Sequence, residues 1–294
     1  MVIATGFFDG VHLGHRLVID KLVTAAAERG DKSMVITFWP HPRNVLQQEA
    51  RNLRLLTSLE EKITLLYSLG VDEVQVLPFT KEFSALTTER FLSEVIMKRF
   101  GGKAILLGYD NRIGSDRATP LETACIAHKL GLDVISGDMV PAQEGFAVSS
   151  TKIREALSEG RVEAASRMLG YEYSLKGVVV SGNQLGRTIG FPTANMQLYD
   201  PLKCVPADGC YLVRAETLDR KLYGMCNIGC RPTVSMEGKH RTIETNIFDF
   251  HEDIYGLDLK ISFLKKIRDE KKFLSLEELK LQLERDRDLC LDNI

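Results

Sequence analysis

The spacing of apolar residues changes near residue 170, and this change constrains the fold of the 294-residue chain more than any other feature. Before it, short β-branched runs alternate with segments of helical period; after it, β-branched runs are separated by Gly and Pro turns. Because each pattern buries its apolar side in a different kind of core, the two patterns predict two domains. We place them at residues 1–172 and 173–294.

The first half predicts an α/β domain. A helix that starts near residue 59 is marked by a capping box, Ser58 with Glu61. The alternation predicts a mostly parallel sheet with helices on both faces, and ligands of such sheets bind beyond the carboxyl ends of the strands. The expected strands are 2–5, 35–38, 74–77, 104–107 and 134–135, and the expected helices are 13–29, 59–69, 90–100 and 121–130.

The second half predicts a small antiparallel β-barrel. Ser275 and Glu278 form another expected capping box, which starts a charged helix whose Leu279, Leu283 and Leu289 are expected to pack against the barrel. The expected strands are 177–182, 211–215, 222–228, 243–250 and 259–264.

Composition excludes several classes of protein. The chain has 38 Lys and Arg against 40 Asp and Glu, a balance that disfavours a nucleic-acid coat. No apolar run approaches the roughly 18 residues of a membrane span, and the first residues lack a basic segment, so we expect a cytoplasmic protein. Its six cysteines are then expected to be buried free thiols, with half a zinc site at Cys226 and Cys230 as the alternative.

The first candidate site is the strand-to-helix turn at residues 6–15, which holds Gly6, Phe7, Asp9, His12, Gly14 and His15. Spacing predicts both imidazoles on one face of the helix, with Gly14 leaving room for a phosphate. Free N–H groups at the helix start favour an anion at the same place. The site would suit nucleotidyl transfer, whose transition state gathers charge on phosphate oxygens. Turn residues with satisfied hydrogen bonds, or a metal site, are the alternatives.

Further polar residues follow later strands of this half. His41 lies just after the second expected strand, and Gly108 and Asp110 follow the fourth. A helix start at residues 149–154 offers hydroxyl groups and an arginine, which suit phosphate binding. An ordinary N-cap beside a surface arginine explains that segment equally well. Its candidate residues are Ser149, Ser150, Thr151 and Arg154.

The second candidate site is a glycine-punctuated loop at residues 182–195 that ends in a proline turn. Thr193 and Asn195 offer oxygen ligands suited to Mg²⁺, while Gly182 and Arg187 suit phosphate. A plain β-turn explains the Gly and Pro residues as well.

A glutamate on an expected strand completes this second candidate. In a regular strand Glu244 shares one face with Asn246 and Phe248. A carboxylate beside a phenylalanine is either a solubilising residue on an edge strand or a base in an active site, and the pattern alone does not choose between them.

The order of these motifs resembles that of bacterial bifunctional riboflavin kinase/FAD synthetases. The chain reads GFFDGVHLGH, TFWPHP, GYD and SSTKIR, followed by GRTIGFPTAN, GMCNIGCRPT, ETNIFDF with DIYG, and RDEKKF, and the series covers nearly the whole length. The resemblance implies a Rossmann-like nucleotidyltransferase domain followed by a six-stranded antiparallel barrel with a terminal helix.

The resemblance also implies roles for single residues. His12 and His15 would contact the ATP phosphates, and Glu244 would be the base for the ribityl hydroxyl of riboflavin. Gly108 and Asp110 would hold the nucleoside, and Thr193 and Asn195 would lie near Mg²⁺ and ATP. Ser150, Thr151 and Arg154 would close on the triphosphate, and the flavin would contact His41, Asn111 and Arg268.

The implied activity has two ATP-dependent steps that need Mg²⁺. The barrel would phosphorylate riboflavin to FMN, and the first domain would adenylylate FMN to FAD with release of pyrophosphate. No nucleic acid, membrane or obligatory protein partner is expected.

The chain departs from the usual family pattern at Trp39, Asn111, Ile113 and Asn246. The alternative is therefore a riboflavin kinase with a weak or inactive adenylyltransferase half. A flavin- or RNA-binding regulator is a third reading, although the barrel lacks a basic stripe or a series of stacking aromatics.

Overall fold

A computed structural model describes residues 1–42, 45, 53–108, 112–136, 148–182, 185–231 and 240–294. Contacts divide the chain into two compact units, Met1–Ser150 and Thr151–Ile294. The helices that follow Ser150 count with the second unit because they pack on its strands, as where the Ala207 N–H donates to the Leu157 carbonyl at 2.8 Å. The boundary at residues 172 and 173 remains a prediction from the change in pattern.

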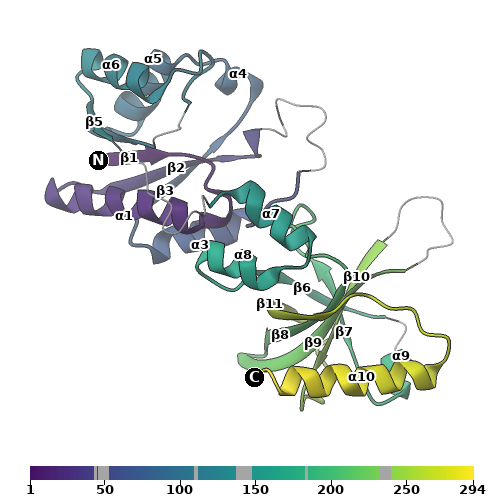
Figure 1. Cartoon of the computed structure of the whole chain (residues 1–294). Coiled ribbons are helices and arrows are strands. Elements are labelled where there is room, and N and C mark those ends of the chain that lie inside the picture. The colour runs from purple at the N-terminus through teal and green to yellow at the C-terminus, as the bar shows by residue number, and fades with distance from the viewer. Residues whose placement is uncertain (43–44, 46–52, 109–111, 137–147, 183–184, 232–239) are drawn as a thin grey trace. The chain divides into compact units, whose positions relative to one another are not determined.

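The first unit is built on a five-stranded parallel sheet with the order β3-β2-β1-β4-β5 (Figure 1). The central strand β1 has β2 on one side and β4 on the other, so the strand order reverses between β1 and β4. Sheets of this type bind ligands at the carboxyl ends of the strands where the order reverses. The predicted parallel sheet is confirmed. Its strands are β1 (Val2–Thr5), β2 (Ser33–Trp39), β3 (Glu73–Pro78), β4 (Ala104–Leu107) and β5 (Asp133–Ser136).

Helices cover both faces of this sheet because successive strand side chains point to opposite sides. Val2 and Ala4 pack with α1 and α3, whereas Ile3 packs on the other side with η3 and α6. The helix expected at residues 90–100 is a π-helix, η3, entered from the short α5. The helices are η1 (Asp9–Val11), α1 (Leu13–Glu28), α3 (Leu59–Ser68), α4 (Lys81–Ser84), α5 (Thr88–Arg90), η3 (Phe91–Arg99) and α6 (Pro120–Leu130).

The second unit is a closed antiparallel barrel with the strand order β10-β7-β6-β11-β8-β9, which confirms the expected six-stranded barrel. The strands are β6 (Ser174–Val180), β7 (Ala194–Leu198), β8 (Gly209–Thr217), β9 (Arg220–Arg231), β10 (His240–Ile247) and β11 (Asp258–Arg268). The helices are α7 (Ser150–Ser158), α8 (Val162–Leu169), α9 (Leu185–Thr188) and α10 (Leu276–Leu291).

Three details of the second unit differ from expectation. Ala194 and Asn195 were expected in a turn, but they are the first residues of β7. The polar and glycine-rich sequence before them gave no sign of a strand. On α10, Leu289 is 49% exposed, whereas Asp286 and Cys290 are fully buried. The capping box is half formed, since Ser275 accepts from the Glu278 N–H but the Glu278 carboxylate accepts from Leu274.

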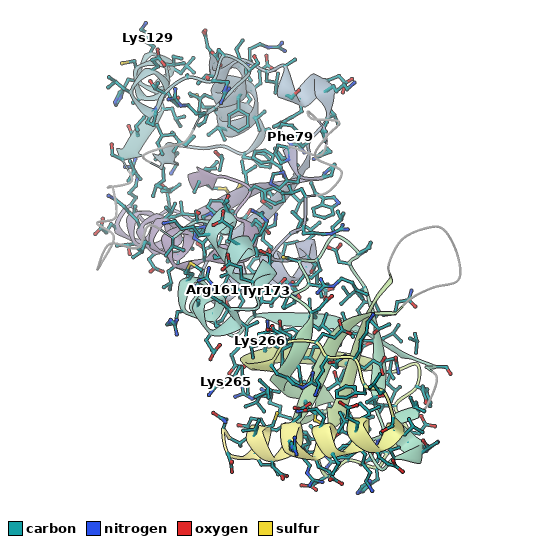
Figure 2. All side chains as sticks on the ribbon, turned by 45° about the vertical axis from the view of Figure 1, so that its right-hand side comes forward. Phe79, Lys129, Arg161, Tyr173, Lys265 and Lys266 are labelled. Atoms are coloured by element: carbon teal, nitrogen blue, oxygen red, sulfur yellow. The ribbon has the colours of Figure 1, made fainter. Side chains whose placement is uncertain are left out.

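The base of the barrel is held to α8 by a buried tyrosine, labelled in Figure 2. The Tyr173 N–H donates to Ser166 Oγ at 3.2 Å, and its hydroxyl donates to the Cys204 carbonyl at 2.5 Å. Its side chain is 1% exposed, so these bonds are shielded from water.

The described cysteines are free, and four of them are buried: Cys204, Cys210, Cys226 and Cys290. Cys125 is exposed, contrary to expectation, and the Cys230 side chain lies outside the described part of the chain. Within the described residues, no group of three or more His, Cys, Asp or Glu side chains could hold a metal ion. Nor does any helix of that part combine the length and apolarity needed to cross a membrane.

Candidate functional site

The turn after β1 has a backbone that most residues avoid. Phe8 has φ 53° and Val11 has φ 37°, both in the left-handed region, and Gly10 between them has φ 81°. Such conformations cost of order 1–3 kcal/mol each for residues with a side chain and persist where surrounding contacts over-determine them. The turn brings His12 to the start of α1, at the carboxyl end of the central strand.

The two histidines are stacked rather than side by side on one helix face. His12 is the N-cap of α1 in an extended conformation, and its Nδ1 accepts from the His15 N–H at 3.3 Å. The ring centroids lie 3.6 Å apart with 14° between the planes. Gly14 favours this packing, because a Cβ there would lie 3.3 Å from the His12 ring, a tight contact from which the ring would have to move slightly.

These contacts set the protonation of both rings. Since Nδ1 of His12 is an acceptor, the proton of its neutral form lies on Nε2. Burial, then the charges of His12 and Lys62, lower the pKa of His15 well below its usual value, so that ring is neutral at pH 7. Nδ1 of His15 is buried and has no hydrogen-bond partner among the described residues.

Asp9 ties the turn to the segment that precedes α3. Its buried carboxylate accepts from the Leu56 N–H at 3.0 Å and the Thr57 N–H at 3.2 Å, and Thr57 Oγ1 accepts from the Gly10 N–H at 3.1 Å. The carbonyl of Asp9 accepts from Ser150 Oγ at 3.0 Å, at the start of α7. These bonds position the turn, and the nucleotide contact of Asp9 remains a prediction.

The Phe7 carbonyl is the second support of the turn. It accepts from Lys62 Nζ at 3.0 Å and from Thr37 Oγ1 at 3.1 Å, and the Phe7 ring packs against His41 with centroids 4.0 Å apart. Burial lowers the pKa of Lys62 to about 8, although the charge of Asp9 opposes this shift. His41 therefore lies beside the turn, as a residue of this site should.

The structure describes only some of the other residues predicted for the first site. Gly108 directly follows β4, whereas Asp110 and Asn111 lie outside the described residues. Gly6 follows β1, and a Cβ there would lie 3.0 Å from the Phe8 ring. Ser149 precedes α7, and Thr151 and Arg154 are in α7 and belong to the second unit.

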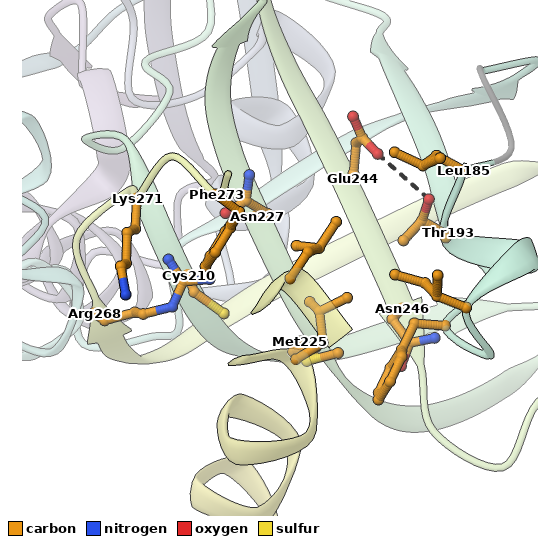
Figure 3. Close-up of a pocket in the computed structure, with 15 residues that line it drawn as sticks. Leu185, Thr193, Cys210, Met225, Asn227, Glu244, Asn246, Arg268, Lys271 and Phe273 are labelled. Atoms are coloured by element: carbon orange, nitrogen blue, oxygen red, sulfur yellow. Dashed lines mark hydrogen bonds between the residues drawn. The ribbon is translucent and has the colours of Figure 1, made fainter. Parts of the chain in front are cut away.

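The barrel holds a cavity of about 320 Å³ between strands β9 and β10 and the helices α9 and α10 (Figure 3). Polar side chains line one part of it and apolar side chains the rest, a combination typical of small-molecule sites. Its polar residues are Thr193, Asn227, Glu244, Asn246, Arg268 and Lys271, and its apolar residues include Leu185, Ile189, Phe191, Met225, Phe273, Leu279 and Leu283.

The register of the barrel strands brings the polar side chains near Glu244 together. Glu244 on β10 lies directly opposite Asn195 on β7 and Asn227 on β9, and directly paired residues point to the same side of a sheet. Its carboxylate accepts from Thr193 Oγ1 at 3.4 Å, the bond drawn in Figure 3. The Asn246 amide donates to the Pro192 carbonyl at 2.7 Å and so holds the segment that carries Thr193.

The donor set fits a magnesium ion. Thr193, just before β7, and Asn195, in β7, supply a hydroxyl and an amide oxygen, and Mg²⁺ prefers such ligands together with substrate phosphate oxygens. Gly182 makes room for one of them, because a Cβ there would lie 2.3 Å from the Asn195 amide nitrogen. Arg187 lies on α9, between Gly182 and Thr193 in the sequence, and its side chain is exposed.

Arg268 lines the cavity but is held by α10. Its guanidinium donates to Asp286 through Nε at 2.9 Å and Nη2 at 2.7 Å, and Nη1 donates to the Asp269 carbonyl at 2.9 Å. Gln282 donates to the same fully buried Asp286. Arg268 thereby fixes α10 across the cavity, and its contact with flavin remains a prediction.

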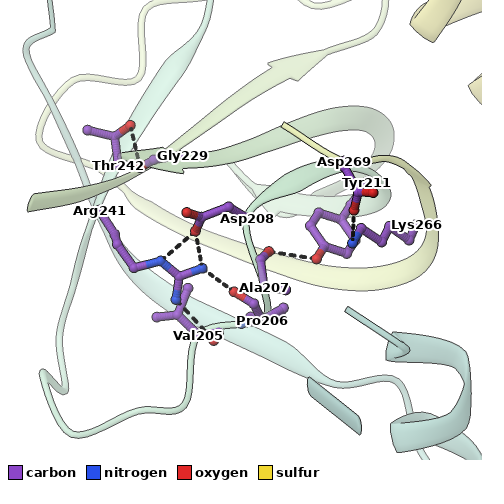
Figure 4. Close-up of polar contacts among 10 residues, drawn as sticks. All are labelled: Val205, Pro206, Ala207, Asp208, Tyr211, Gly229, Arg241, Thr242, Lys266 and Asp269. Atoms are coloured by element: carbon purple, nitrogen blue, oxygen red, sulfur yellow. Dashed lines mark hydrogen bonds and ion pairs between the residues drawn. The ribbon is translucent and has the colours of Figure 1, made fainter. Parts of the chain in front are cut away.

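The strand that carries Glu244 is anchored at its other end by Arg241 (Figure 4). Nε of Arg241 donates to Asp208 at 2.8 Å, and Nη2 donates to the Pro206 carbonyl. The Ala207 carbonyl accepts from the Tyr211 hydroxyl at 2.6 Å. The segment 205–208 therefore links β10 to β8.

Two family profiles divide the chain as the two sites do: FAD synthetase matches residues 1–152, and riboflavin kinase matches residues 169–293. The bifunctional riboflavin kinase/FMN adenylyltransferases of Bacillus subtilis (strain 168) and Escherichia coli (strain K12) are each 37% identical over 289 residues, which cover 97% of this chain and 90% of each relative. The chain belongs to the bifunctional riboflavin kinase/FMN adenylyltransferase family.

A solved structure has the same fold. A crystal structure from Streptococcus pneumoniae, described as a macrolide-efflux protein, matches 98% of this chain and 93% of its own with a TM-score of 0.90 and 34% identity. That description differs from those of the sequence relatives, so the family assignment rests on the two profiles and the relatives.

Three departures from the family pattern fall where the structure describes them. Trp39 is the last residue of β2, opposite Pro78 of β3, and its carbonyl accepts from the Phe79 N–H at 3.0 Å. Ile113 is 7% exposed in the core beside η3, and its carbonyl accepts from Thr88 Oγ1 at 2.8 Å. Asn246 supports Pro192, as described above. All three residues are therefore packed or hydrogen-bonded within the described part of the chain.

Sequence reasoning missed several supports of the two sites. Thr57, Lys62, Asn227 and Asp286 carry no motif of their own. The signal for Lys62 is its helical position: it shares the buried face of α3 with Leu66, where a lysine is out of place unless it has a partner. The same signal marks Asp286 beside Cys290 on α10.

Proposed function

We propose that the barrel transfers the γ-phosphate of ATP to riboflavin, and that the first unit transfers AMP from a second ATP to FMN. The observation that carries the proposal is the placement of Glu244, which lines the barrel cavity and contacts Thr193 at 3.4 Å. A carboxylate, a hydroxyl and two amides converge there beside an apolar wall that suits a flavin ring.

In the first step, the Glu244 carboxylate accepts the proton of the ribityl hydroxyl as that oxygen attacks the γ-phosphorus and ADP leaves. Thr193 and Asn195 would hold Mg²⁺, which when bound neutralises phosphate charge. Asn227 and Asn246 orient the substrate side of the cavity, and α10 closes its far side through Leu279 and Leu283.

In the second step, an oxygen of the FMN phosphate attacks the α-phosphorus of ATP and pyrophosphate leaves. Nε2 of His12 donates a hydrogen bond to a phosphate oxygen, and the neutral His15 ring offers its unpartnered Nδ1. Ser150, Thr151 and Arg154 are proposed to hold the triphosphate and Gly108 and Asp110 the nucleoside, with His41 and Asn111 near the flavin. The cytoplasmic location and the absence of nucleic-acid and protein partners remain predictions.

The test is a product assay on the unmodified chain. Riboflavin with Mg²⁺ and ATP should give FMN and then FAD, and FMN supplied alone with Mg²⁺ and ATP should give FAD and pyrophosphate. FMN formation without FAD from supplied FMN would leave a kinase only, and no turnover of either substrate would contradict the proposal. Omission of Mg²⁺ should stop both steps.

A further inference from the structure

The first unit contains a buried lysine that no step above uses. Lys62 on α3 is 1% exposed, and its neighbour on the buried face is Leu66. A charged ammonium in an apolar setting is costly unless it has hydrogen-bond or charge partners. Its presence there calls for a reason beyond packing, since a methionine would fill similar space without that cost.

The contacts of the ammonium all lead to the turn after β1. It donates to the Phe7 carbonyl at 3.0 Å and lies 3.8 Å from the centroid of the Phe7 ring. The titratable groups that face it are the Asp9 carboxylate in the turn and His15 at the start of α1. His12 stacks on His15, and His41 packs on the Phe7 ring.

Lys62 and Asp9 form two ties that run in opposite directions. The Asp9 carboxylate in the turn accepts from the N–H groups of Leu56 and Thr57. In the other direction, the Lys62 ammonium on α3 donates to the Phe7 carbonyl in the turn. Phe8, in the left-handed region, lies between Phe7 and Asp9, and Gly10, with φ 81°, directly follows Asp9. Removal of either tie frees a strained backbone to relax and carries His12 with it.

We propose that Lys62 is a positioning residue for adenylyl transfer, whose ammonium holds the strained turn and whose charge is complemented by the phosphates of the bound nucleotide. The inference rests on the proposed function of the first unit. Lys62 supports the phosphate-binding turn through the Phe7 carbonyl, and its ammonium adds a positive charge close to the neutral His15 ring.

The charge requirement gives a test that a purely structural role would not pass. With a pKa of about 8, Lys62 of the free enzyme loses its proton above that pH, so kcat/KM for ATP in FAD synthesis from FMN should fall toward pH 9. A Lys62→Arg variant stays charged and should lack that fall. Lys62→Met should lower kcat/KM at pH 7 by about 10²-fold, as expected for a displaced reactive group.

The controls use the same chain. FMN formation from riboflavin should be unchanged in both variants, and Lys129→Met, at an exposed lysine of α6 labelled in Figure 2, should leave both activities unchanged. A flat wild-type profile from pH 7 to 10 would overturn the proposal without any variant, as would a fall shared by Lys62→Arg or full activity of Lys62→Met. Absence of FAD synthesis in the wild-type chain would instead contradict the function of the first unit.

Discussion

The two sites of this protein are built in different ways. The barrel site stands on regular strands, where register alone sets Glu244 opposite Asn195 and Asn227. The site of the first unit stands on a turn with three residues at positive φ, two of them not glycine, and the buried side chains of Asp9 and Lys62 hold this turn in place. A site on strands inherits its geometry from backbone hydrogen bonds, whereas a site on a strained turn depends on contacts from distant parts of the chain.

The largest expected effect is the selective loss of one of the two activities when the proposed reactive residues of one site are replaced. Glu244→Gln removes the proton acceptor and should lower FMN formation about 10²- to 10⁴-fold, while FAD formation from supplied FMN stays intact. The double variant His12→Ala with His15→Ala should do the reverse. Chromatography of the flavin products measures both.

Glu252→Gln and His128→Ala, at exposed positions of the barrel and of α6, are the matched controls. Equal loss of both activities in either test variant would contradict the division of labour between the two units.

The next effect concerns the stability of the barrel site. Asp286→Asn leaves the Arg268 guanidinium without its charged partner in a buried place, and the loss of one member of such a pair costs about 3–5 kcal/mol of unfolding free energy. Denaturant unfolding should show it, together with loss of FMN formation as α10 detaches.

Asp288→Asn removes an exposed carboxylate two residues further along the same helix and should change the unfolding free energy by less than about 1 kcal/mol. Equal changes in unfolding free energy for the two variants would show that the Asp286–Arg268 pair stabilises the barrel no more than an exposed ion pair does.

A smaller effect is expected where a charge supports a turn. Asp9→Asn keeps one oxygen acceptor but weakens the charge-assisted bonds from the Leu56 and Thr57 N–H groups, and one hydrogen bond to a charged group is worth about 1.5–3 kcal/mol. FAD formation should fall while FMN formation is unchanged. Asp20→Asn on the exposed side of α1 is the control, and a fall in FMN formation as well would point to general unfolding.

The smallest effect is a dependence of stability on pH. The folded pKa of His15 is lowered, so below its unfolded pKa of about 6.5 the unfolded chain binds a proton that the folded chain does not, and stability falls as pH drops through that range. The contribution is at most about 1.4 kcal/mol per pH unit. Thermal unfolding between pH 7 and 5.5 should show a shallower slope in His15→Gln, and an unchanged slope would contradict a neutral buried ring.

Much of the architecture was predictable because it follows from local pattern. The parallel sheet, the barrel and the start of α1 at the turn all come from periodicity and from Gly and Pro positions. The strand β7 was not predictable, since Ala194 and Asn195 follow a proline turn without an apolar alternation and are paired only through tertiary contacts with β6 and β10. The stacking of His12 on His15 also escaped prediction, because the extended N-cap, and not helical spacing, sets it.

The sequence by itself determined the two kinds of core, the order of the motifs and the residues proposed to carry the chemistry, because these depend on residue type and on near neighbours. Only the tertiary structure decided which charges support those residues. Lys62 meets Phe7 across 55 positions and Arg268 meets Asp286 across 18, and the burial that lowers one pKa and makes the other pair strong exists only once the cores have closed.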